Sequence, residues 1–98
     1  MLKEACVENF TNVPGVIERG AKRIELCDNL AVGGTTPSIG VIKITAEYCS
    51  DKDASIIVIL RPRGGDFVYS LMEKAIMMRD LEEIIASHAN GIAVGALT

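Results

Sequence analysis

Two short segments of the chain repeat the pattern Glu-x-Cys, at residues 4–6 and 25–27. If each segment lies on a β-strand, its acid and its thiol share one face, because side chains alternate with period two. Neighbouring strands lie about 4.8 Å apart, so a matching register brings Cys6 and Cys27 face to face. Two soft thiolates held in this way favour Cu(I) over Mg²⁺ or Ca²⁺. The alternative is that both thiols are small, buried hydrophobic side chains.

The segment Arg-Pro-Arg-Gly-Gly-Asp-Phe, after the third apolar run, is a second candidate site. Arg61 and Arg63 share one face of the predicted strand, and a guanidinium pair binds carboxylate or phosphate through paired hydrogen bonds. Asp66 follows in the loop. The alternative is that the arginines neutralise Glu4 and Glu25, since a buried unpaired charge is costly. We expect Arg61 to be mainly structural and Arg63, nearer to solvent, to keep a free donor.

Three further features carry weaker signals. Residues 33–38, Gly-Gly-Thr-Thr-Pro-Ser, are typical of a strand-to-helix turn and also of a loop that holds an anion with backbone donors. Cys49 falls near a predicted helix end, where a structural or surface thiol is expected. His88 is the only histidine. Its place near the end of the third helix predicts a capping or surface role.

The elements that must position these residues alternate between strand and helix. Short apolar runs predict the strands, at residues 2–8, 23–28, 55–62 and 91–97. No hairpin dipeptide joins successive strands, so we predict parallel strands connected by right-handed crossovers. This α/β pattern fits an open sheet or part of a (β/α)8 barrel, and periodicity alone does not choose between them. In both folds, active sites are built at the carboxyl ends of the strands.

Helix start signals separate the predicted strands. The expected N-caps are Asn12, with Pro14 in its first turn, Thr36, with Pro37 as the first helical residue, and Ser70, in a capping box with Glu73. The third helix carries an apolar stripe at helical spacing, at Leu71, Ala75, Met78, Leu81 and Ile85.

Composition limits the classes of function. The 98 residues suffice for one domain or a piece of one. The net charge of −3, with no long run of like charges, argues against nucleic acid and anionic membranes as partners. No signal peptide or uninterrupted apolar span is evident. Three widely spaced cysteines indicate reduced thiols. We therefore predict a cytoplasmic protein without nucleic-acid or membrane partners.

Four motifs, in this order and spacing, resemble the CutC family of copper homeostasis proteins. They are Arg-Ile-Glu-Leu-Cys at 23–27, Gly-Gly-Thr-Thr-Pro-Ser at 33–38, Arg-Pro-Arg-Gly-Gly-Asp-Phe at 61–67 and Gly-Ala-Leu-Thr at 95–98. The resemblance covers essentially the whole chain. It implies that residues 1–98 are a single unit, the N-terminal half of a cytosolic (β/α)8 TIM-type barrel with four parallel strands and three helices. A complete barrel needs about 250 residues, so we expect unpaired outer strands and a longer parent protein.

The resemblance also implies a role with copper. The family's cysteines on strands one and two correspond to Cys6 and Cys27, as ligands of Cu(I). Its polar barrel mouth corresponds to Glu4, Glu25, Arg61, Arg63 and Asp66. We therefore predict an intracellular copper homeostasis protein that binds Cu(I) through a thiol pair. The alternative is an enzyme of unknown reaction that acts on a small phosphate- or carboxylate-bearing molecule, with the five polar residues as its catalytic groups. A homo-oligomer is compatible with both.

Overall fold

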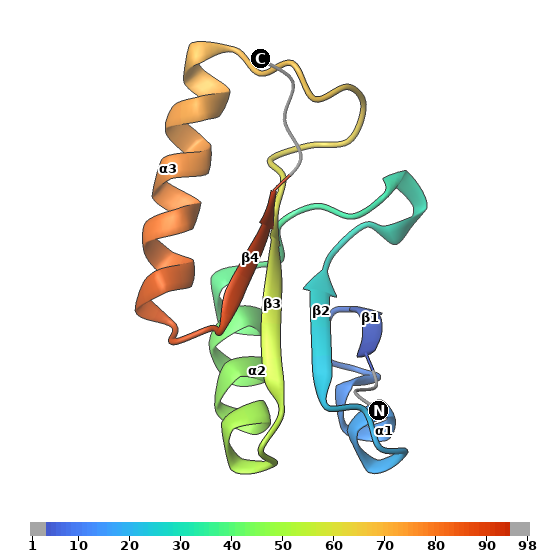
Figure 1. Cartoon of the computed structure of the whole chain (residues 1–98). Coiled ribbons are helices and arrows are strands. Elements are labelled where there is room, and N and C mark those ends of the chain that lie inside the picture. Colours follow the sequence, from blue (N-terminus) through green and yellow to red (C-terminus); the bar gives the residue numbers. More distant parts are fainter. Residues whose placement is uncertain (1–3, 95–98) are drawn as a thin grey trace.

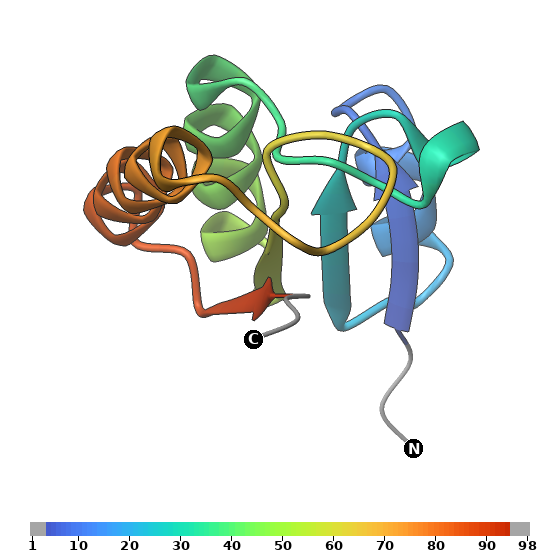
Figure 2. The same ribbon diagram turned by 90° about the horizontal axis from the view of Figure 1, so that it is seen from above.

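A computed structural model describes residues 4–94, which form one parallel sheet with its helices on one side (Figures 1 and 2). The strands are β1 (Glu4–Glu8), β2 (Arg23–Cys27), β3 (Ser55–Leu60) and β4 (Gly91–Val94). Their spatial order is β1-β2-β3-β4, and each neighbouring pair is parallel. Both the α/β class and the parallel pairing predicted from the sequence are confirmed.

Helices connect the successive strands. They are α1 (Val13–Glu18), α2 (Ile39–Asp51) and α3 (Leu71–Ala86), with a short 3₁₀ helix η1 (Leu30–Val32) after β2. Within residues 4–94, none of the helices is both long and apolar enough to cross a membrane.

The strand ends differ slightly from the predicted ones. β3 ends at Leu60, so Arg61 begins the following loop, whereas the predicted strand ran on to residue 62. The predicted extension of the first strand to residue 2, that of the last strand to residue 97 and the motif at 95–98 lie outside the described residues.

The start of α2 corrects the predicted N-cap. Ser38 caps this helix, with its extended backbone and a hydroxyl that accepts a hydrogen bond from Val41 N at 3.3 Å. Thr36, two residues earlier, does not cap the helix, because its amide and hydroxyl are bonded to the backbone of Arg61. By contrast, the capping box of Ser70 and Glu73 at the start of α3 is confirmed.

The core lies between the helices and one face of the sheet. Six strand residues on this face are at most 5% exposed: Val7, Ile24, Leu26, Ile56, Val58 and Leu60. Helix residues Val13, Ile42 and Ile84 cover them. The burial pattern follows the period-two alternation of a sheet with one covered face.

The apolar stripe of α3 is only partly buried. Ile84 is fully buried, and Met77 and Leu81 pack against the core. Leu71 and Ile85, which share the predicted stripe, are 86% and 64% exposed. The helix therefore meets β3 along a neighbouring face, and its remaining apolar side chains point away from the described core.

Candidate functional site

The thiols of β1 and β2 lie on the face of the sheet opposite the helices. Cys6 is paired in register with Glu25, and Glu8 is paired with Cys27. The two thiols are therefore diagonal neighbours, offset by two residues, and the directly opposed arrangement expected from a matching register is wrong. Cys6 is exposed, whereas Cys27 is only 1% exposed. Because the offset is an even number of residues and side chains alternate with period two, the pair still occupies one face.

The two side chains interact in spite of the offset. Burial raises the pKa of Cys27 to about 12, and the neighbouring Cys6 thiol adds to the shift through charge and a hydrogen bond. The Cys27 thiol also donates to Val7 O at 3.5 Å. At neutral pH this thiol is therefore protonated. Cys49 lies apart from the pair, in α2 within the helix-side core, where burial raises its pKa.

The two acids of the Glu-x-Cys segments have different surroundings. Glu4 Oε1 accepts a hydrogen bond from Arg23 Nε at 3.1 Å, directly across the β1–β2 ladder. Glu25 is half-buried and faces Cys6 on one side.

The predicted pairing of these acids with the loop arginines is wrong for residues 4–94. Glu25 is in register with Ile57. Arg61 lies four residues further along the chain, roughly 13 Å away at 3.3 Å per residue. Strand register therefore places Glu4 at the amino end of the sheet, Glu25 midway along it and the arginines beyond its carboxyl end.

Arg61 is buried between two loops. It is 7% exposed, and its Nη1 donates to Val32 O at 2.6 Å and to Gly34 O at 3.2 Å. Nη2 donates to Gly65 O at 2.7 Å in the loop after β3. The Phe67 ring centre lies 4.8 Å from the guanidinium carbon. Its Nε has no partner within the described part of the chain. Arg61 thus fastens the β2–α2 loop to the β3–α3 loop.

Thr36 strengthens the same connection through the backbone. Its amide donates to Arg61 O at 2.9 Å, and its hydroxyl accepts from Arg61 N at 2.9 Å. Sequence reasoning missed this role, because a Thr-Pro pair equally predicts an N-cap.

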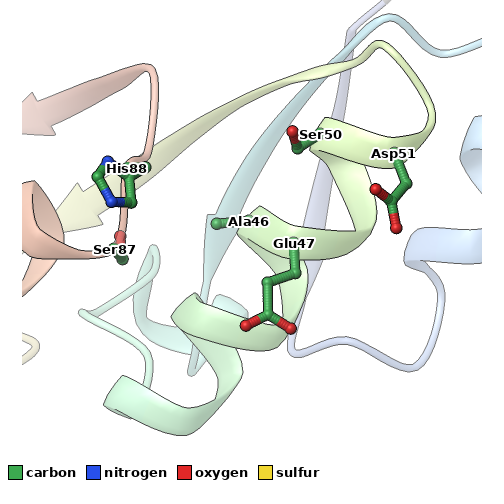
Figure 3. A pocket seen from close by; sticks show the side chains of 6 residues that line it. All are labelled: Ala46, Glu47, Ser50, Asp51, Ser87 and His88. Carbon is green, nitrogen blue, oxygen red and sulfur yellow. The ribbon is translucent and has the colours of Figure 1, made fainter.

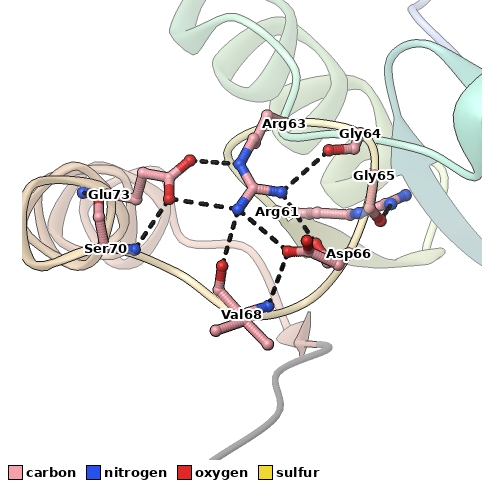
Figure 4. A network of polar contacts seen from close by, with 8 residues as sticks. All are labelled: Arg61, Arg63, Gly64, Gly65, Asp66, Val68, Ser70 and Glu73. Atoms are coloured by element: carbon pink, nitrogen blue, oxygen red, sulfur yellow. Dashed lines mark hydrogen bonds and ion pairs between the residues drawn. The ribbon is translucent and has the colours of Figure 1, made fainter.

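Arg63 is engaged on all sides of its guanidinium (Figure 4). Nε and Nη2 both donate to the Glu73 carboxylate, and Nη2 also donates to Asp66 Oδ1 and to Val68 O. Nη1 donates to the carbonyls of Gly64 and Asp66. The prediction that Arg63 keeps a free donor for a ligand is therefore wrong for residues 4–94. The network therefore holds the residues of the β3–α3 loop together and ties the loop to the first turn of α3.

Glu73 completes this network from the first turn of α3. One oxygen also accepts from Ser70 N at 2.9 Å, so the capping box and the ion pair share a carboxylate. The hydrogen bond from Arg63, with that from the Ser70 backbone, lowers the pKa of Glu73 to about 2. The capping box is visible in the sequence, but the contact with Arg63, ten residues away in the chain, needs the path of the loop.

Acid should therefore weaken the fold partly through Glu73. A carboxyl group whose pKa is lower in the folded chain stabilises it above the ordinary value of about 4.3, and this contribution is lost as pH falls. For Glu73 the window runs down to about 2. In the wild type the urea midpoint should fall as the pH is lowered through this window. We expect this fall to be smaller in Glu73→Gln, because the substituted side chain does not titrate. Glu82→Gln, at an exposed position of the same helix, is the control. Parallel curves for Glu73→Gln and wild type would contradict this coupling.

A polar pocket of about 460 Å³ lies at the opposite end of the sheet (Figure 3). The residues that line it come from α2 and from the turn after α3: Ala46, Glu47, Ser50, Asp51, Ser87 and His88. These segments lead into the amino ends of β3 and β4, and α/β proteins build their sites at the other edge. His88 is exposed there, with a left-handed φ of 66°. Its exposed side chain agrees with the surface role predicted from its place near the end of the third helix.

The donor set limits what metal this part of the chain can hold. Within residues 4–94, no group of three or more His, Cys, Asp or Glu side chains is placed to bind a metal ion. The Cys6 and Cys27 pair supplies two sulfur donors on one face. Two soft donors fit Cu(I) and are a poor match for Mg²⁺, Ca²⁺ or a four-ligand zinc site.

Comparison with known proteins gives a consistent result. The model of the family described as "CutC family" matches residues 1–98. A "family protein CutC" of Enterococcus faecalis is 53% identical over 98 residues, which are 100% of this chain and 47% of that protein. The human "Copper homeostasis protein cutC homolog" is 40% identical over 97 residues, covering 99% of this chain and 34% of its own length. The chain thus spans half or less of the length of these relatives.

A solved structure extends the similarity to the fold. The crystal structure of a CutC protein from Streptococcus agalactiae superposes with a TM-score of 0.95 at 45% identity. The match covers 100% of this chain and 47% of that one. Four parallel strands with three helices that match about half of a larger structure are consistent with half of a barrel.

Proposed function

The chain belongs to the CutC family, and on this premise we propose that it handles copper by binding Cu(I) between the thiols of Cys6 and Cys27. The observation that carries the proposal is the placement of two interacting thiols on one face of adjacent strands. Thiolates are the soft ligands that select Cu(I). The human and mouse relatives are named copper homeostasis proteins, which supports copper as the cargo.

The surroundings of the pair favour entry of the ion from one side. Cys6 is exposed and can contact an incoming Cu(I) first, while Cys27 must release the proton that it now donates to Val7 O. Glu25, directly across from Cys6, adds negative charge beside the two sulfurs. A cation is stabilised by such a neighbour, and a metal bound by thiolates displaces thiol protons.

The proposed site requires a reducing compartment. All three are free thiols. A Cu(I) site of two thiols persists only where thiols stay reduced, as they do in the cytosol. We accordingly propose a cytoplasmic role.

The enzyme alternative has less support from the arginines beyond the carboxyl end of β3. A site for a phosphate- or carboxylate-bearing substrate needs an accessible donor. In residues 4–94 the guanidinium of Arg63 is saturated, and that of Arg61 is buried against loop carbonyls. We therefore place the proposed binding chemistry on the thiols.

Anaerobic titration with Cu(I) against a competing chelator tests the copper proposal. We expect one Cu(I) per chain and an X-ray absorption spectrum of low-coordinate copper with sulfur neighbours, because the site offers two thiolates. Failure to compete with the chelator, or copper with only nitrogen and oxygen neighbours, contradicts it.

A further inference from the structure

The turn that follows β2 covers the buried thiol of Cys27. Gly34 is buried in this turn with a left-handed φ of 95°. A Cβ atom at Gly34 would lie 3.3 Å from Cys27 Cβ and 3.5 Å from its sulfur, so the glycine backbone rests directly on the side chain. Access to Cys27 from this side therefore depends on the position of the turn.

Arg61 holds the turn in this position. Its Nη1 donates to Val32 O and Gly34 O, while Nη2 donates to Gly65 O in the next loop. The fit is close, because a Cβ at Gly33 would lie 2.9 Å from Nη1. The guanidinium is thus placed to keep the Gly33–Gly34 turn against the end of β3.

Apart from Arg61, the turn is held by polar contacts at its base, which are the bridge between Asp28 and Thr35 and the bond from Asn29 Nδ2 to Thr35 Oγ1 at 3.0 Å. Leu30 and Val32 are 42% and 51% exposed, so the turn buries little apolar surface. Segments with few buried apolar contacts open more readily than the core. Hydrogen bonds between a buried charged donor and carbonyl oxygens are stronger than neutral ones, and three such bonds meet at Arg61.

We propose that Arg61 is a positioning residue that holds the Gly33–Gly34 turn closed over Cys27 and thereby limits how fast a reagent or metal ion reaches this thiol. For copper as the incoming ion, this rests on the proposed function. For any other thiol reagent it rests on the geometry of the turn alone. Cys6 is not covered in this way, since it is exposed.

Alkylation by iodoacetamide in the whole chain tests the proposal without copper. Cys6→Ser is the background, so that the exposed thiol does not react. Trypsin cleavage after Lys and Arg then places Cys27 and Cys49 on separate peptides for mass spectrometry. We expect Arg61→Met to raise the alkylation rate of Cys27 at least about tenfold, because the loss of one charge-assisted hydrogen bond suffices for that factor.

Cys49 and two further variants separate positioning from general stability. Cys49 is 0% exposed in the core and reports unfolding, so we expect its rate to stay unchanged. Arg63→Met removes a guanidinium that bonds only within its own loop and α3, and should leave Cys27 protected. Arg61→Lys keeps a cation without the fork of donors and should give an intermediate Cys27 rate, with Cys49 still protected. Equal Cys27 rates in wild type and both Arg61 variants, or Cys27 and Cys49 rates that rise together in both, overturn the proposal.

A copper measurement on the chain with all three cysteines keeps the two proposals distinguishable. If Arg61→Met accelerates both alkylation of Cys27 and uptake of Cu(I), both proposals are supported. If alkylation accelerates but neither protein binds Cu(I), the role of Arg61 stands and the copper function fails.

Discussion

Replacing Cys6 or Cys27 with serine is expected to abolish tight Cu(I) binding, whereas Cys49→Ser should leave the affinity unchanged. A two-thiol site loses half of its ligands with either substitution, and a serine hydroxyl is a hard, weak ligand for Cu(I). Outer-shell partners of metal sites already contribute about 10- to 100-fold to affinity, so a lost ligand should exceed that range. Competition with a chelator under anaerobic conditions measures the effect.

The three substitutions together discriminate between explanations. Cys49 is buried in the helix-side core, so its serine variant controls for unspecific damage from a lost thiol. A melting curve for each variant checks that the chain is folded. Undiminished affinity in either Cys6→Ser or Cys27→Ser removes the pair as the copper site. Loss of binding in all three variants points to the fold as the cause.

The thiol pair shows what the sequence can and cannot supply. Period-two alternation correctly predicts that each acid and thiol share a face, and the βα rhythm correctly predicts adjacent parallel strands. Register is set by contacts along the whole strand pair, and it places Cys6 beside Glu25. A diagonal thiol pair cannot be distinguished from an opposed one by spacing alone.

The arginine segment shows a different limit. Its position at the carboxyl edge of the sheet was predictable, but its partners were not. Arg61 and Arg63 bind loop carbonyls and a helix carboxylate whose positions depend on the path of two irregular loops. Electrostatic balance alone suggests Glu4 and Glu25 as partners, but the register places Glu4 at the amino end of the sheet and Glu25 midway along it. The balance of charges in the sequence therefore predicts that the two arginines need partners, but it does not identify which residues these partners are.

Local helix signals succeeded where no tertiary contact competed. The capping box at Ser70 formed as expected, since both of its groups belong to one turn. Thr36 was predicted as a cap, yet its hydroxyl is bonded to the backbone of Arg61, so Ser38 caps the helix. A threonine near the end of a neighbouring strand can bond to the backbone of that strand instead of capping its own helix. The sequence of the helix start alone does not reveal this competing partner.

Leu26→Ala is expected to lower the free energy of unfolding by about 2–5 kcal/mol, the range for a fully buried leucine. Leu26 is 0% exposed on β2, where the sheet packs under the helices. Urea denaturation of the chain measures the change. Ile85→Ala is the matched control, because Ile85 is 64% exposed on α3 and its loss should cost no more than about 0.5 kcal/mol.

The contrast between these two substitutions also tests whether the exposed side of α3 is covered by other protein surface. Equal losses from Leu26→Ala and Ile85→Ala in this chain would show that α3 is covered along its exposed stripe by a second copy of the chain. The relatives carry more than half of their length beyond the matched region, and parallel barrels bury such helix faces against the next helix. In a protein that includes that second half, Ile85→Ala should therefore approach the cost of Leu26→Ala, whereas in this chain the two should stay apart.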